Sequence, residues 1–475
     1  MPTLQHLHAR AKNLVASTKE AVSDGVDATL EETTKRVDIV QKDPISANGI
    51  LNIAILILGF LLFLGLCYVA YKGAKVLGEG IGNVIIPIIP ENKDPGIGKP
   101  GDDPTVELVV FYGQSLAVGV NGKPILSTTQ ENPENVLSLS DGPGGSQLPL
   151  APCIEKNRGN EGETPASGMA NVYFRKYMKS QKNRVIIVGA FGVGSQSIKD
   201  LSPGTMNYER SKERIELILK GAKEKFPDAK SVKQVAMCWL QGERDWKTDT
   251  TPDEYKRRFK VMVEDMNKVA LSSSSLPPDS PQNTPLAILS YQTSYGSAKG
   301  SVITQTQLDM HNEGMLHMVS PIYFLQLASD GIHLSPRSSG IIGAYFARGL
   351  DARRRGKRPP LITPQGIAAS GNKVTVKFSV PSPPLKAATY RSVQNHGFNI
   401  SGATITSVDI LKNEVVLNTS KPVSQGSIVS YAMSGSGNIG FGTLMDSCED
   451  KVNIGASGQD EVVLSNYCPH FSLTL

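Results

Sequence analysis

From about residue 105 the chain repeats one rhythm, and this rhythm limits its fold more than any other feature does. Short apolar, β-branched runs alternate with longer segments in which apolar residues recur every three or four positions. Runs of the first kind are typical of buried parallel strands, and the second spacing is typical of helices. The runs are 106–112, 184–190, 234–240, 286–291 and 322–327. They predict a three-layer α/β/α domain around a five-stranded parallel sheet, over residues 105–352.

Helical spacing fills the intervals between these runs. It covers 168–180, 208–226, 253–271, a weaker segment at 302–317, and a last helix that follows Pro336 and includes 341–349. Parallel strands joined by helices place their carboxyl ends at one edge of the sheet, where α/β proteins bind their ligands. We therefore expect the functional residues directly after the strands.

A serine and a glycine cluster follow the first two predicted strands. Ser115 comes after Gly113-Gln114, and a hydroxyl in this position becomes a nucleophile once a base takes its proton. The alternative interpretation of Ser115 is a helix N-cap. Gly192 and Gly194 would let backbone N–H groups approach an oxyanion, and the alternative there is a plain glycine-rich turn. Their spacing does not fit a nucleotide-binding glycine motif.

The third predicted strand ends in an amide and two carboxylates. The sequence there is Trp239-Leu240-Gln241-Gly242-Glu243-Arg244-Asp245. The Gln241 amide can donate to a developing oxyanion, and Glu243 can hold a histidine or an arginine. A surface loop with an Arg–carboxylate pair is the alternative.

A carboxylate and a histidine follow the fifth predicted strand, three positions apart. Asp330 and His333 lie in a loop before a helix, a spacing that suits the acid–base half of a catalytic triad. Of the seven histidines in the chain, His333 alone lies at a predicted strand end with a carboxylate beside it. The alternative is a structural histidine with its hydrogen bonds satisfied.

Taken together and in this order, the four blocks resemble the SGNH (GDSL-like) hydrolase superfamily. They are most similar to its sialate O-acetylesterase and acetylxylan esterase branch, whose blocks read Gly-Gln-Ser-Asn, Trp-x-Gln-Gly-Glu-x-Asp and Asp-x-x-His. The match covers about residues 105–350 and is most specific in the tryptophan block. The resemblance implies Ser115 as nucleophile, His333 as base and Asp330 as the residue that orients His333. Glu243 is a rival or an auxiliary in that last role.

The resemblance also implies an oxyanion hole and two departures from the family pattern. The hole would consist of the Ser115 N–H, a glycine N–H and the Gln241 amide. Leu116 replaces the asparagine that the family often has after the serine. The glycine block departs as well, which leaves the choice between Gly192 and Gly194 open, and we prefer Gly194.

The function that the resemblance implies is a serine carbohydrate esterase that removes O-acetyl groups from a surface polysaccharide. It needs no metal and no cofactor, and the five cysteines contain no CxxC pair for a zinc site. A net charge of +5 over 475 residues is too small to predict nucleic-acid binding. The alternatives are a non-catalytic, glycan-binding (receptor-binding) phage tail protein and a membrane-anchored structural protein.

The first 104 residues are interpreted as a tether. Residues 1–77 are predicted to be a helical segment. Its first part, 1–49, is helix-permissive with heptad-like apolar spacing over 4–40, and 50–70 form an apolar run in which Asn52 is the one strongly polar side chain. A helix of this length, about 30 Å, would cross a bilayer, or it would form the dry core of a homotrimeric stalk. The run begins too late to be a cleavable signal peptide. Residues 78–104, rich in glycine and proline, predict a linker.

Residues 361–475 change to β character. Short alternating strands with frequent turn residues predict a β-sandwich, at 374–380, 414–418, 427–433 and 470–475. This region looks similar to the β domain of some phage and bacterial acetyl hydrolases, and its role would be carbohydrate binding or packing against the cleft. We expect the protein in a virion, as a phage tail appendage whose residues 1–77 bind other tail proteins. The alternative is membrane anchoring with the catalytic domain outside the cytoplasm.

Overall fold

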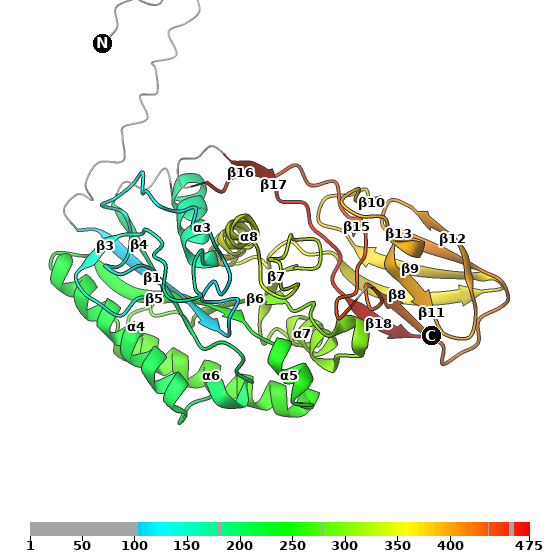
Figure 1. Cartoon of the computed structure of the whole chain (residues 1–475), viewed down its shortest axis with the longest axis horizontal. Helices are drawn as coiled ribbons and strands as arrows, with labels where there is room; N and C mark the ends of the chain where they lie inside the picture. The colour runs from blue at the N-terminus through cyan, green and yellow to red at the C-terminus, as the bar shows by residue number, and fades with distance from the viewer. Residues whose placement is uncertain (1–102, 179–182, 278, 436, 456–459) are drawn as a thin grey trace, which may run out of the picture. The chain divides into compact units, whose positions relative to one another are not determined.

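The computed structural model describes residues 103–475, apart from 179–182, 278, 436 and 456–459 (Figure 1). The predicted tether 1–77, its apolar run 50–70 and nearly all of the linker 78–104 lie outside these residues. In the described part of the chain, no helix combines the length and the apolar character that a membrane span needs.

A seven-stranded sheet forms the centre of the first described region. Its order is β3-β2-β4-β1-β5-β6-β7, and each neighbouring pair is parallel except β2 and β3. The strands are β1 (Thr105–Gly113), β2 (Val136–Leu139), β3 (Leu150–Pro152), β4 (Arg184–Gly192), β5 (Ser231–Leu240), β6 (Ala287–Gln292) and β7 (His317–Pro321). The α/β fold with a mostly parallel sheet is confirmed. The predicted number of five strands is wrong, because the short strands β2 and β3 extend one edge.

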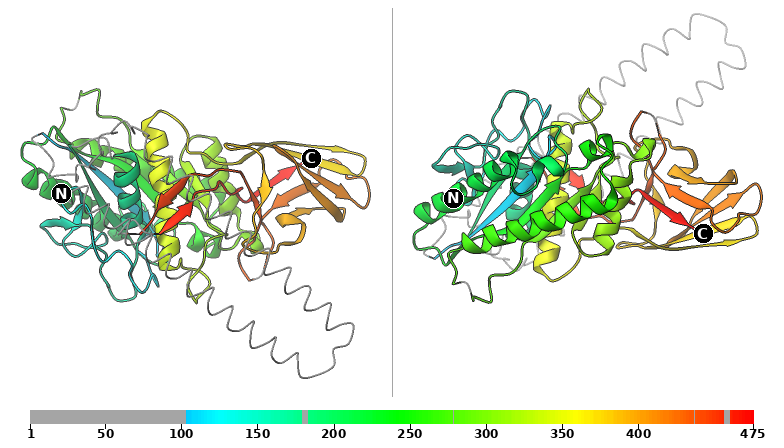
Figure 2. Two further views of the ribbon diagram at one scale, coloured as in Figure 1. Left: turned by 90° about the horizontal axis from the view of Figure 1, so that it is seen from above. Right: turned by 90° about the horizontal axis from the view of Figure 1, so that it is seen from below.

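Helices cover both faces of this sheet, as the two views of Figure 2 show. One face carries α4 (Met206–Lys225), α6 (Pro252–Ser272) and α7 (Val302–Asn312), and the other carries α3 (Pro165–Val172) and α8 (Pro336–Arg354). Alternate side chains of β1 enter the two cores: Leu108 belongs to the core under α4 and α6, whereas Val109 belongs to the core under α3 and α8. This alternation follows from the two-residue period of a strand buried on both sides.

Four of these helices begin at a capping side chain. In α3 the cap is the Thr164 hydroxyl, which accepts a hydrogen bond from the Ala166 N–H. The hydroxyls of Thr205, Thr251 and Ser335 each accept a hydrogen bond from a backbone N–H in the first turn of α4, α6 and α8. Pro252 and Pro336 then occupy the first helical position, where the missing N–H of proline has no cost. The predicted starts of α4, α6 and α8 therefore lie within one or two residues of the observed ones.

The fifth predicted strand, 322–327, is wrong, since β7 covers the preceding residues His317–Pro321. The apolar side chains after β7 are buried by the C-terminal region instead of by a sheet. The Tyr323 hydroxyl donates to the carbonyl of Cys468 at 2.7 Å, and the Phe324 ring stacks on Tyr467 with ring centroids 3.6 Å apart. Burial by a distant segment thus produced an apolar run that resembles a strand.

The C-terminal region consists of antiparallel sheets, as predicted. The larger two have the orders β12-β13-β9-β8 and β11-β14-β18, and two small sheets pair β10 with β15 and β16 with β17. Their strands are β8 (Thr363–Ser370), β9 (Lys373–Ser379), β10 (Lys386–Ala387), β11 (Phe398–Ile400), β12 (Ile405–Ile410), β13 (Glu414–Thr419), β14 (Ile428–Tyr431), β15 (Leu444–Met445), β16 (Lys451–Asn453), β17 (Glu461–Val463) and β18 (Phe471–Thr474). Phe378 of β9 contacts Phe471 of β18 with ring centroids 5.9 Å apart, so the two larger sheets share one core.

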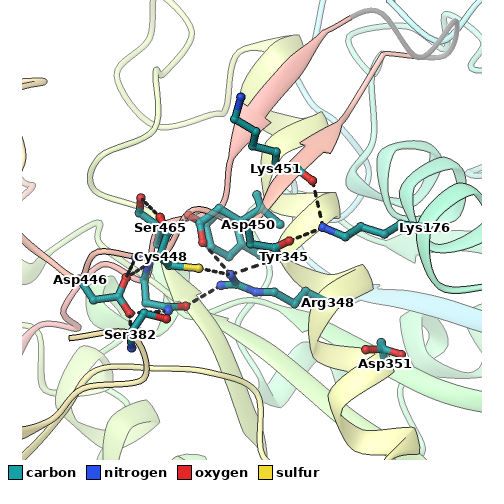
Figure 3. A network of polar contacts seen from close by, with 12 residues as sticks. Lys176, Tyr345, Arg348, Asp351, Ser382, Asp446, Cys448, Asp450, Lys451 and Ser465 are labelled. Carbon is teal, nitrogen blue, oxygen red and sulfur yellow. Dashed lines mark hydrogen bonds and ion pairs between the residues drawn. The ribbon is translucent and has the colours of Figure 1, made fainter. Parts of the chain in front are cut away.

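The last part of the chain returns to the α/β region and is fixed there by a charged network (Figure 3). The buried Arg348 of α8 donates to the carbonyl of Leu464 and to Asn466 Oδ1, both at 2.6 Å. Asp450 lies 3.7 Å from the same guanidinium and forms an ion pair with Lys176. Because a buried charge without its partners is strongly destabilising, this network ties the two regions together. The boundary between 352 and 361 stays a prediction.

Candidate active site

Ser115 lies in the turn that follows β1, at the carboxyl edge of the sheet. Gly113 ends the strand at φ 153°, and a Cβ there would lie 2.0 Å from the carbonyl oxygen of Leu240. Only glycine allows β1 and β5 to end this close together. The side chain of Gln114 accepts a hydrogen bond from the Arg244 N–H at 3.3 Å, which joins the turn to the segment after β5. Ser115 itself is 6% exposed.

Of the two candidate glycines, the structure brings Gly194 to Ser115. A Cβ on Gly194 would lie 3.6 Å from Ser115 Cβ. Gly192 instead pairs with Gly113 in the sheet, and a Cβ there would lie 2.2 Å from the Gly113 carbonyl oxygen. The backbone N–H groups of Ser115 and Gly194 have no hydrogen-bond acceptor among the described residues. These two donors are therefore not engaged by the described part of the protein.

Asp330 and His333 form a hydrogen-bonded pair in the loop before α8. His333 Nδ1 and Asp330 Oδ2 are 2.5 Å apart, and Asp330 Oδ1 accepts the N–H groups of Ile332 and His333 at 2.9 and 3.0 Å. Asn121 Nδ2 also donates to Asp330 Oδ2, at 2.7 Å. Burial alone would raise the pKa of Asp330, but these hydrogen bonds outweigh it and hold the pKa well below its ordinary value. The carboxylate stays charged and fixes the proton on Nδ1, which leaves Nε2 as the acceptor.

Glu243 lies in a different environment at the start of α5 (Glu243–Lys247). It is 4% exposed, and its Oε1 accepts the hydroxyls of Tyr291 at 2.5 Å and Thr293 at 2.8 Å. Its Oε2 has no partner among the described residues. Burial raises the pKa of Glu243, and the donating hydroxyls and the nearby His333 offset only part of this rise. His333 Nδ1 bonds Asp330 and not Glu243 in this structure.

Gln241 is fully buried and its amide is engaged. Its Nε2 donates to the carbonyl of Gln196 at 3.2 Å and to the Asp245 carboxylate, while its Oε1 accepts the hydroxyl of Tyr255 at 3.0 Å. Both amide hydrogens thus have acceptors. The predicted oxyanion role of Gln241 would require one of these bonds to break.

Three contacts of this site escaped the sequence analysis. Asn121 carries no spacing relation to Asp330, 209 positions away, and its only signal is a turn-type Asn-Gly pair. Tyr291 and Thr293 lie at the end of β6, where the strand-end rule would have found them had the segment after the fourth predicted strand, 286–291, been considered as well. Leu116, which departs from the family pattern, is 3% exposed and belongs to the core under α3 and α8.

The C-terminal region holds the segment that follows β6. Gln292 exchanges two hydrogen bonds with the backbone of His470, at 2.8 and 3.0 Å, and His470 Nε2 lies 2.8 Å from the hydroxyl of Ser294. Burial lowers the pKa of His470 to about 4, so the ring is neutral at pH 7. Farther along, the Gly296 N–H donates to the carbonyl of Asn438 at 2.8 Å. These contacts favour a packing role for the C-terminal region beside the site.

A metal centre finds no support in the described part of the chain. No group of three or more His, Cys, Asp or Glu side chains is placed there to hold an ion. A hydroxyl, an imidazole and backbone N–H groups are the residue types that acyl transfer needs, and here they follow the strands of one sheet.

The family is decided by a match between residues 105–351 and the model of the family described as carbohydrate esterase, sialic acid-specific acetylesterase. The chain belongs to this family. Membership makes the protein a carbohydrate esterase with an SGNH-type α/β domain, as the sequence predicted. The matched residues include Ser115, Gly194, Glu243 and the Asp330–His333 pair.

Solved structures that the chain matches include two esterases. A carbohydrate acetylesterase from Xanthomonas citri is 16% identical, with 77% of this chain and 80% of that chain covered and a TM-score of 0.46. A protein from Arabidopsis thaliana is 18% identical over 52% of this chain and 98% of its own, with a TM-score of 0.38. A variant acetyl xylan esterase from Geobacillus stearothermophilus is 14% identical over 52% and 96%, with a TM-score of 0.29. No curated protein matches the chain.

Proposed function

We propose that this carbohydrate esterase removes O-acetyl groups from an acetylated polysaccharide, with Ser115 as nucleophile, His333 as base and Asp330 as the group that orients His333. The observation that carries the proposal is the 2.5 Å contact between His333 Nδ1 and Asp330 Oδ2, in a loop that Asn121 joins to the Ser115 turn. Family membership supports a carbohydrate ester as the substrate.

The reaction follows from this arrangement in two halves. His333 Nε2 takes the proton of the Ser115 hydroxyl while Oγ attacks the acetyl carbonyl carbon, and the carbonyl electron pair moves onto oxygen. Collapse of this intermediate breaks the ester bond, and the sugar oxygen leaves with the proton from His333. Water then attacks the acetyl-serine with His333 again as base, and acetate leaves as Ser115 regains its proton. Asp330 remains charged throughout and stabilises the imidazolium.

The oxyanion is held by backbone donors in this proposal. The N–H groups of Ser115 and Gly194, which lack acceptors among the described residues, would bind the developing charge. Gln241 would add a third donor only after releasing Gln196 or Asp245. Glu243 acts as an auxiliary whose charge, when present, favours protonated His333.

We place this activity at a surface polysaccharide that a phage tail appendage meets, with a membrane-anchored enzyme as the alternative. The support is in the sequence, where heptad-like spacing over 4–40 favours self-association and the apolar run 50–70 suits either a trimeric core or a bilayer. Light scattering of the full chain with and without detergent separates the two, since a stalk is trimeric without detergent and a membrane span requires it.

The test of the proposed function is the Ser115→Ala variant. Hydrolysis of p-nitrophenyl acetate and release of acetate from acetylated bacterial polysaccharides should fall by on the order of 10⁴ or more, because the attacking hydroxyl is absent. The unfolding midpoint should stay within about 2 °C of the wild type, since only one hydroxyl is lost. Retained turnover would exclude Ser115 as nucleophile. No hydrolysis by the wild-type chain, with glycan binding intact, would favour the non-catalytic receptor-binding function.

A further inference from the structure

One asparagine joins the turn that carries Ser115 to the loop that carries Asp330 and His333. Asn121 Nδ2 donates to Asp330 Oδ2 at 2.7 Å, and the same oxygen lies 2.5 Å from His333 Nδ1. At the other end of the turn, the Val120 N–H donates to the carbonyl of Ser115 at 3.0 Å. The segment 115–121 therefore has the proposed nucleophile, Ser115, at one end and a hydrogen-bond partner of Asp330, Asn121, at the other.

The backbone holds Asn121 in place before any substrate binds. Its φ is 58°, in the left-handed region that asparagine tolerates better than most residues. Its N–H donates to the carbonyl of Asn160 at 2.8 Å, and its own carbonyl accepts from Lys123 N–H at 2.9 Å. Val120 and Glu161 form an antiparallel bridge beside it. The amide is thus presented to Asp330 by a rigid turn, although the residue itself is exposed.

We propose that Asn121 is a positioning residue for the reaction, which sets the charge and the orientation of Asp330 and, through it, of His333. The inference rests on the proposed function of Ser115, His333 and Asp330. Two backbone N–H groups hold Asp330 Oδ1, and Asn121 and His333 share Oδ2, so the carboxylate has four donors. Hydrogen bonds to the ionised form favour that form and fix the rotation of the carboxylate. Without Asn121, the imidazole loses part of its alignment toward Ser115.

Two substitutions at Asn121 separate this role from a purely structural one. Asn121→Gly removes the amide and keeps the left-handed backbone accessible, so we expect kcat to fall about tenfold with KM within about twofold. Asn121→Asp keeps the shape and replaces a donor by a second negative charge near the imidazole. That charge favours protonated His333, so the acid limb of the kcat/KM profile should move to higher pH by about one unit. A loop that only supports the fold would not move this limb.

The matched control is Asn395→Gly. Asn395 is a second left-handed asparagine, with φ 49°, in the C-terminal region, and its substitution should leave kcat and the acid limb unchanged. A kcat of Asn121→Gly within about twofold of the wild type, or an unmoved acid limb in Asn121→Asp, overturns the inference while Ser115→Ala and Asp330→Asn remain inactive. Activity that survives both Ser115→Ala and Asp330→Asn refutes the proposed function and the inference with it.

Discussion

The two carboxylates of the site, Asp330 in the loop before α8 and Glu243 after β5, have opposite surroundings. Asp330 is 29% exposed at its side chain and accepts four hydrogen bonds, and its pKa lies below the ordinary value. Glu243 is buried, one of its oxygens has no partner among the described residues, and its pKa is raised. Burial raises the pKa of Glu243, whereas the hydrogen-bond donors around Asp330 outweigh its smaller burial and lower its pKa.

The comparison assigns different work to the two groups. A carboxylate that is always ionised can stabilise an imidazolium as it forms, whereas a buried one with a raised pKa offers that help only when it loses its proton. The loop of Asp330 is held by its own backbone and by Asn121. The position of the Glu243 side chain depends instead on Thr293, and the segment of Thr293 contacts the C-terminal region through Ser294. Substitutions around Asp330 and around Glu243 should therefore lower activity by different amounts, and they should act through different parts of the chain.

The largest effect is expected from Asp330→Asn. The amide no longer stabilises the imidazolium, and it favours the histidine tautomer that presents a hydrogen instead of a lone pair to Ser115. We expect kcat to fall by on the order of 10⁴, measured with p-nitrophenyl acetate. If Asp330→Asn lowered kcat by less than Glu243→Gln does, the orienting role would belong to Glu243.

Glu243→Gln should cost much less, about tenfold in kcat, because it removes a charge that reaches His333 only indirectly. The hydroxyls of Tyr291 and Thr293 can still donate to the amide oxygen, so the residues around position 243 should keep their packing. Steady-state kinetics of the two variants side by side give the ratio. Equal losses for Asp330→Asn and Glu243→Gln would show that both carboxylates orient His333.

A smaller effect still is expected from Ser294→Ala, which breaks the contact between the β6 segment and His470. We expect a roughly two- to threefold lower kcat, because the segment that places Thr293 on Glu243 gains freedom. A double-mutant cycle checks the route: in the Glu243→Gln background the Ser294→Ala effect on kcat should largely vanish. Full additivity would mean that the C-terminal region acts on the site by another path.

Much of the α/β region could be predicted because its signals are local. The β1 run is recognisable as a buried strand from its own β-branched residues. The start of α6 is likewise marked by its own residues, Thr251-Pro252. The failure at 322–327 had a non-local cause, since Tyr323 bonds the carbonyl of Cys468 and Phe324 stacks on Tyr467. A strand and a loop buried by a distant segment have the same apolar composition.

The residues of the candidate site differ in the same respect, since some of their contacts are local in sequence and others are not. Asp330 and His333 are three positions apart, and their pairing could be predicted from that spacing. Asn121 reaches Asp330 across 209 positions, and the full engagement of the Gln241 amide depends on Gln196 and Asp245. Contacts between loops that belong to different strands are fixed by the fold, so a single sequence carries no spacing that reveals them.

The smallest effect on activity is expected at a third carboxylate, Glu155. The same comparison of burial and hydrogen-bond donors applies to it, although it has no role in the proposed reaction. Glu155 is fully buried, its Oε1 accepts the N–H and the hydroxyl of Thr164, and its Oε2 has no partner among the described residues. Burial, together with the charge of the nearby Glu163, raises the pKa of Glu155 to about 8. The folded state therefore stays protonated there while the unfolded chain ionises at about pH 4.3, so the free energy of unfolding falls as pH rises from about 4.3 to about 8.

Glu155→Gln should remove this loss, with kcat within about twofold of the wild type. Denaturant unfolding should show the variant gaining stability over the wild type by roughly a few kcal/mol between about pH 5 and about pH 8.5. Parallel pH curves for the two proteins would mean that Glu155 is already ionised in the folded state, and that one donor residue is enough to keep a buried carboxylate charged.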